Sequence, residues 1–204
     1  MGTKKPSSNK LFNKQFSKGK VGEEYFEHVI AKDYFDELYM YNDFNNPVDR
    51  RYQIDGIDGY IKDNKWDNKY FIEIKSNLTY NPILKDFSAC LEFNKWDISE
   101  QQHHGNDEEE GYIQDSKAHR IYHLEVINTK NTKSGFVGTG NWVYYDLPTM
   151  RNFIHREWNK PKATNWIRAL SFVGGYNSNY ARLISMSVKD SRFPLHNKRS
   201  ITYR

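Results

Sequence analysis

Cysteine is almost absent from this sequence: the 204-residue chain has one, Cys90. A single cysteine excludes an internal disulfide framework and a zinc site made of several cysteines. We therefore expect the protein in a reducing compartment, the cytoplasm, where Cys90 is a small buried hydrophobic residue.

Long apolar runs are also lacking. No stretch reaches the length of a membrane span, and the first ten residues have no apolar segment typical of a signal peptide. Hydrophobic residues make up 37% of the chain and aromatic residues 16%, and the mean hydropathy is −0.91. We therefore expect a soluble protein with no membrane partner, whose core is filled largely by Tyr, Phe and Trp.

The charge is mildly basic, with a net value of +4. Such a balance suits a protein that binds a polyanion but does not require one. Residues 1–20 are rich in Lys, Asn and Ser, and we expect a flexible basic arm in which Lys18 and Lys20 can follow a phosphate backbone. A solubilising tail is the alternative for this arm. Residues 21–204 are expected to form one domain.

A helix is expected from Val21 onward. Apolar or small residues recur on one face at 3.6-residue spacing, namely Gly22, Tyr25, Phe26, Val29 and Ile30. Glu23 lies at the edge of this face, and an acidic residue in a first turn is also favoured by the helix dipole alone.

The segment 54–77 reads as two short strands joined by a polar turn, and it contains the strongest chemical pattern of the chain. Asp58 begins the first strand, and Glu73 and Lys75 lie two residues apart on the second. Because strand side chains alternate between faces, Glu73 and Lys75 share a face and can meet Asp58. Two carboxylates and an ammonium suit a hard divalent cation and a phosphate. Asp55 is the competing first carboxylate.

The remaining elements are expected to alternate between helix and strand. We predict a polar loop over 42–52, helices over 83–93 and 148–158, strands over 120–128, 142–145, 169–173 and 181–188, and an exposed loop over 129–140. The acidic, histidine-containing segment 100–115 is expected to be a solvated loop rather than a metal site.

The order Asp58, Glu73, Lys75 resembles the motif of the PD-(D/E)XK nuclease superfamily, although Ile57 stands where that family often has proline. The resemblance implies a restriction-endonuclease-like mixed central sheet flanked by helices. It also implies catalysis by Asp58, Glu73 and Lys75, with Glu23 of the first helix near the metal. Cleavage to 5′-phosphate and 3′-hydroxyl ends, and action as a homodimer, are further implications.

The chemistry of these residues predicts a Mg²⁺ ion, replaceable by Mn²⁺, held by Asp58, Glu73 and the backbone carbonyl of Ile74. Residues beside this strand or facing the expected cleft are candidates for contact with DNA, and these are Ser76, Asn77 and Lys85, together with Lys18 and Lys20. The expected function is a DNA endonuclease acting on duplex DNA, in a restriction-type, phage or mobile-element setting. The alternatives are a non-catalytic nucleic-acid-binding module and a nuclease of the Holliday-junction-resolvase type.

Overall fold

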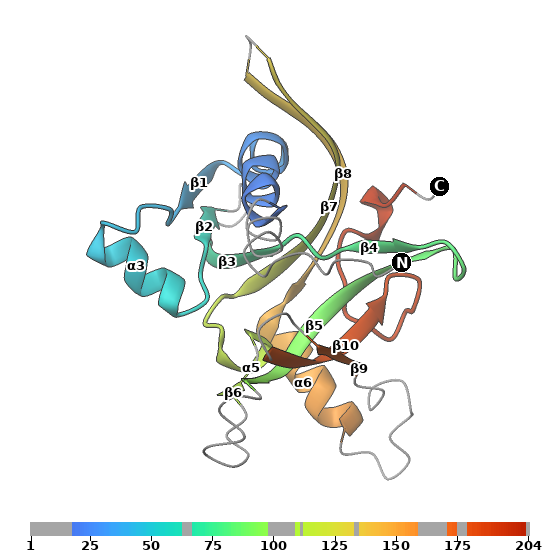
Figure 1. Ribbon diagram of the computed structural model, residues 1–204. Helices are drawn as coiled ribbons and strands as arrows, with labels where there is room; N and C mark the ends of the chain where they lie inside the picture. Colours follow the sequence, from blue (N-terminus) through green and yellow to red (C-terminus); the bar gives the residue numbers. More distant parts are fainter. Residues whose placement is uncertain are drawn as a thin grey trace, which may run out of the picture.

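The computed structural model describes residues 18–62, 67–97, 109–110, 112–132, 135–158, 171–174 and 179–202. Its described part is mixed α/β, with two sheets and flanking helices (Figure 1). The first sheet has the order β1-β2-β3-β7-β8, and the second has the order β4-β5-β10-β9 with β6 paired to β5. A mixed sheet flanked by helices agrees with the predicted class at this coarse level.

The first sheet carries the 54–77 hairpin. Its strands are β1 (Glu37–Met40), β2 (Gly59–Lys62), β3 (Lys69–Lys75), β7 (Arg120–Thr132) and β8 (Gly135–Asp146). The β3–β7 pair is parallel, and the other pairs are antiparallel. β7 and β8 form a long curved hairpin (Figure 1).

A helix over residues 18–34 covers one face of this sheet. It includes a π-helical turn, η1 (Phe26–Ile30), and ends in α2 (Ala31–Tyr34). Its expected apolar face is buried, and the core beneath it consists of Tyr25, Phe26, Ile30, Ala31, Ile61, Ile72, Ile74, Tyr122, Leu124 and Trp142. The predicted helix is confirmed, but it is already helical at residue 18. Residues 18–20, expected to belong to the basic arm, are therefore part of this helix, and residues 1–17 of the arm lie outside the described part.

A second core lies where the first sheet meets the second sheet and α6 (Leu147–Trp158). The strands of the second sheet are β4 (Thr79–Asn81), β5 (Asp86–Asp97), β6 (Glu109–Glu110), β9 (Ser171–Gly174) and β10 (Asn179–Ser187). Two short elements complete the described part: α5 (Tyr112–Asp115) lies against β5, and η2 (Lys198–Ser200) lies against β8 of the first sheet. The predicted strands near 120–128, 142–145, 169–173 and 181–188, and the helix near 148–158, are confirmed within a few residues.

The predicted polar loop over 42–52 was wrong in its second half, because α3 (Pro47–Ile54) is a helix. Asn46 caps it by accepting a hydrogen bond from the Val48 amide at 2.9 Å, and Pro47 occupies the first turn, where it is tolerated. Asp49, in the first turn of this helix, is buried and accepts a hydrogen bond from the Asp43 amide at 3.2 Å.

Two further predictions were wrong. Residues 83–93 do not form a helix but a turn followed by β5, in which the buried residues Phe87, Ala89 and Leu91 alternate with period two. Residues 129–140 are not an open loop, because β7 continues to Thr132 and β8 begins at Gly135. Of the acidic segment 100–115, only 109–110 and 112–115 are described. No helix in the described part of the chain has the length and apolar character needed to cross a membrane.

Candidate functional site

The pairing of β2 with β3 brings Asp58 to Glu73. Gly59 pairs with Ile72 in the antiparallel ladder, so that the preceding residue, Asp58, lies opposite Glu73. The Asp58 amide donates to the Ile72 carbonyl at 2.8 Å, and the Ile74 amide donates to Oδ2 of the Asp58 carboxylate at 2.6 Å. The carboxylate is thereby fixed against the strand that carries Glu73.

Glu73 and Lys75 share a face of β3, as the alternation predicts. Ile72 and Ile74 are buried against the first helix, whereas the Lys75 ammonium forms an ion pair with Oε1 of Glu73. Glu73 is only 3% exposed. The Lys75 side chain keeps 32% of its surface exposed, so its charge remains accessible from solvent.

The second oxygen of Glu73, Oε2, is buried and has no hydrogen-bond partner among the described residues. The nearby Ser116 hydroxyl donates to the Gly56 carbonyl at 2.8 Å. Burial raises the pKa of Glu73, and Lys75 and, to a smaller degree, the proximity of Ser116 oppose this shift. An orphaned buried carboxylate oxygen is costly unless a donor or a cation reaches it.

Asp58 is half-buried and its pKa is raised to about 6. Desolvation is the main cause; the Lys75 charge and the Ile74 hydrogen bond act in the opposite direction, and the charge of Glu23 raises the pKa further. The pKa of Glu23 is itself raised by burial and lowered by Lys20 and Lys75. Asp58, Glu73, Lys75 and Glu23 thus form one electrostatically connected group.

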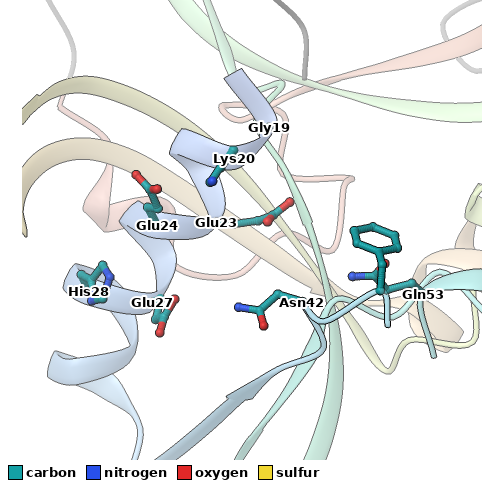
Figure 2. A pocket seen from close by; sticks show the side chains of 9 residues that line it. Gly19, Lys20, Glu23, Glu24, Glu27, His28, Asn42 and Gln53 are labelled. Atoms are coloured by element: carbon teal, nitrogen blue, oxygen red, sulfur yellow. The ribbon is translucent and has the colours of Figure 1, made fainter. Parts of the chain in front are cut away.

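Glu23 also lines a cavity of about 500 Å³ between the first helix and the segment leading into α3. Its side chain extends from the helix toward the side where Gln53 lies, whereas Glu24 leaves the helix in another direction (Figure 2). The cavity lining consists of Gly19, Lys20, Glu23, Glu24, Glu27, His28, Asn42, Phe44 and Gln53. Because this lining contains Glu23, the cavity adjoins the group that includes Asp58.

The competing carboxylate, Asp55, has a different environment. It lies at the end of α3, and one of its carboxylate oxygens forms an ion pair with the Lys117 ammonium at 2.5 Å. The geometry therefore groups Asp58, and not Asp55, with Glu73 and Lys75.

The residues proposed to contact DNA have varied positions. Ser76 has a buried hydroxyl with no hydrogen-bond partner among the described residues, and it lies against Gly22 of the first helix. Lys20 lines the cavity and Lys18 is exposed on the same helix. Lys85 is exposed in the β4–β5 turn, which projects away from the β2–β3 hairpin (Figure 1).

The Asn77 side chain has internal partners. Its amide nitrogen donates to the Cys90 carbonyl at 2.9 Å, and its amide oxygen contacts Nδ1 of His123. His123 is fully buried, pairs with Lys75 in the parallel β3–β7 ladder, and has its pKa lowered to about 3 by burial and by the Lys75 charge. Sequence reasoning missed this neutral histidine. Its only signal was a polar residue inside the apolar stretch 120–128.

The described residues contain no cluster of three or more Asp, Glu, His or Cys side chains arranged to hold a metal ion. The possible oxygen ligands are therefore the carboxylates of Asp58 and Glu73 with the backbone carbonyl of Ile74. Two carboxylates with raised pKa values, one with an orphaned oxygen, fit a hard cation that accepts a small oxygen ligand set and keeps several waters.

Comparisons with protein-family models, with curated proteins and with solved structures found no match to this chain.

Proposed function

We propose that this protein is a magnesium-dependent DNA endonuclease that hydrolyses phosphodiester bonds of duplex DNA to 5′-phosphate and 3′-hydroxyl ends. The observation that carries the proposal is the β2–β3 pairing, which sets Asp58 opposite Glu73 while Lys75 pairs with Glu73. The resemblance to PD-(D/E)XK nucleases gives catalytic roles to these same three residues. A parallel β3–β7 pair within a mixed sheet is compatible with a restriction-endonuclease-like fold.

The metal would be held by Asp58, Glu73 and the Ile74 carbonyl. The orphaned Oε2 of Glu73 and the raised pKa of Asp58 support this assignment. A bound dication would give Oε2 of Glu73 a partner and would favour the ionised form of the Asp58 carboxyl. Bound Mg²⁺ supplies positive charge at the phosphate and acidifies the attacking water, and Mn²⁺ would substitute for it.

Lys75 provides a positive charge at the site from the protein's own side chains. Its ammonium neutralises Glu73 and remains partly exposed, so it can also reach an incoming phosphate. Lys75 would position the attacking water and offset the charge that develops on the scissile phosphate. Glu23 faces the adjoining cavity and would orient water that enters from it.

The single cysteine favours a cytoplasmic enzyme, and the family resemblance implies one that cuts duplexes as a homodimer, one site for each strand. A restriction-type, phage or mobile-element nuclease fits this form, and a Holliday-junction-resolvase-type nuclease is the alternative within the same chemistry.

Plasmid cleavage tests the proposal. Supercoiled DNA is incubated with the full chain in Mg²⁺, in Mn²⁺ and in EDTA, and the ends of the products are mapped. We expect metal-dependent nicking and linearisation, and a loss of at least about 100-fold in rate for Glu73→Gln and for Lys75→Ala.

Two variants serve as matched controls. Lys69→Ala removes an exposed lysine from the same strand, and Asp33→Asn removes an exposed carboxylate from the first helix. Both should cut at nearly the wild-type rate. Intact plasmid under all metal conditions, together with firm DNA binding, would favour the non-catalytic binding module instead. Cleavage by Glu73→Gln and Lys75→Ala at the control rate would show that the activity belongs to another site.

A further inference from the structure

The outward face of α3 carries an unusual combination of exposed apolar and cationic side chains. Pro47, Arg50, Arg51 and Ile54 fall at positions i, i+3, i+4 and i+7 and share one side of the helix. All four are exposed, and Ile54 reaches 72%. With the preceding Phe44, which is 66% exposed, they line a shallow groove of about 280 Å³, here called the α3 groove.

The charge of the α3 groove is positive. Arg50 and Arg51 form no ion pair within the described part of the chain. The one acidic residue of the lining, Asp55, is already paired with Lys117 at 2.5 Å. Two guanidinium groups therefore face solvent without a neutralising carboxylate beside them.

Phe44 separates the α3 groove from the cavity next to Glu23, because it lines both. The two hollows have opposite charge: the cavity contains three glutamates and one lysine, and the groove contains two arginines and a neutralised aspartate. A polyanion held at Asp58 and Glu73 would be repelled by the glutamates and attracted by the arginines. The charges thus favour a polyanion that extends from Asp58 and Glu73 over the α3 groove and not over the cavity.

We propose that the α3 groove binds the sugar–phosphate backbone of duplex DNA beside the cleavage site. This inference rests on the proposed function and adds the surface that holds the substrate. Arg50 and Arg51 would donate to phosphate oxygens, a task for which the planar guanidinium is well suited. Phe44 and Ile54 would pack against the sugars. Position supports the assignment, since only three residues separate the end of α3 at Ile54 from Asp58.

The test measures DNA binding directly, in EDTA, so that no cleavage occurs. The full chain and its Arg50→Ala/Arg51→Ala variant are titrated onto a fluorescent 30-base-pair duplex by anisotropy at several salt concentrations. Each lost phosphate contact reduces the slope of log K against log salt by about 0.9, so we expect a slope shallower by about 2. Affinity near 0.1 M salt should fall by roughly 10- to 100-fold.

The matched control is Arg156→Ala/Arg199→Ala, which removes two exposed arginines from α6 and η2, away from α3 (Figure 1). It changes the net charge equally, yet should keep the slope and bind within about threefold of wild type, because distant charges are screened. Equal losses for the two double variants, or no loss for either, would overturn the inference.

The outcome can be separated from that of the cleavage test. If plasmid is cut while the α3 variant binds like the control, the endonuclease proposal stands and the groove assignment fails. If plasmid stays intact while binding depends on Arg50 and Arg51, the groove assignment stands and the endonuclease proposal fails. If wild type binds no duplex, the groove assignment also fails.

Discussion

The Asp58 carboxylate accepts a hydrogen bond from the Ile74 amide at 2.6 Å, across the two strands of the hairpin. This bond favours the ionised carboxylate, and so does the nearby Lys75 ammonium, yet the pKa of Asp58 is raised to about 6. Desolvation therefore outweighs both. In the absence of a bound cation, the ionised Asp58 carboxylate therefore lowers the free energy of unfolding.

Replacing Asp58 by Asn should stabilise the protein while abolishing cleavage. The amide oxygen of asparagine can still accept from Ile74, but no charge is desolvated. Because the folded pKa lies above the ordinary value of 3.8, wild type takes up a proton on folding and gains stability as the pH falls from about 6 to about 4.

The unfolding temperature of Asp58→Asn in EDTA should therefore exceed that of wild type at pH 8, and the difference should shrink at pH 5. A gain of ~1 kcal/mol corresponds to roughly 2–4 °C for a chain of this size. Asp33→Asn, at an exposed position, provides the baseline. A lower unfolding temperature for Asp58→Asn than for wild type at pH 8 would contradict the charge balance described above.

Added metal should raise the unfolding temperature, and more at pH 8 than at pH 5. The raised pKa values of Asp58 and Glu73 mean that protons compete with the cation at low pH. At tenfold excess over the dissociation constant the stabilisation is about 1.4 kcal/mol, readily seen in a thermal scan. Mg²⁺ and Mn²⁺ should lose this effect in Asp58→Asn and Glu73→Gln but keep it in Asp33→Asn. An equal shift in all variants would place the metal elsewhere.

The sequence allowed the local part of this site to be predicted. Asp58 directly precedes β2, Glu73 and Lys75 lie on the adjacent strand β3, and the alternation of strand side chains fixes which of them share a face. The first helix was equally predictable, since Tyr25, Phe26 and Ile30 repeat at helical spacing.

Contacts that depend on the pairing of strands far apart in the sequence could not be predicted. The partnership of Lys75 with His123 exists only because β3 pairs with β7, and nothing local to either residue indicates it. The segment 83–93 fits two periods at once: Leu84, Phe87 and Leu91 have helical spacing, whereas Phe87, Ala89 and Leu91 alternate as in a strand. Pairing with β10 decides for the strand.

Gly22 allows the first helix to approach β3 closely, and its replacement by Ala should be harmful. A Cβ at this position would overlap Oγ of Ser76. Alanine normally stabilises a helix interior relative to glycine, by up to ~1 kcal/mol, but overpacking here should cost about 1–3 kcal/mol and displace Glu23.

A double-mutant cycle checks this contact by chemical denaturation. Ser76→Ala alone should be nearly neutral or stabilising, because its buried hydroxyl has no partner among the described residues. Gly22→Ala combined with Ser76→Ala should recover much of the stability lost in Gly22→Ala. Additive free energies in the cycle would mean that the helix does not approach Ser76 as the structure describes.

Phe44→Ala should weaken DNA binding without changing its salt dependence. Phe44 is exposed and lines the α3 groove, but it carries no charge. The number of counterions that leave the DNA on binding should therefore be the same for the variant and the wild type. An apolar contact worth about 1 kcal/mol corresponds to a roughly fivefold weaker affinity, with an unchanged slope of log K against log salt. Val48→Ala, an exposed apolar residue of α3 outside the groove lining, should bind like wild type. Equal affinities for Phe44→Ala and Val48→Ala would restrict the DNA contact to the arginines.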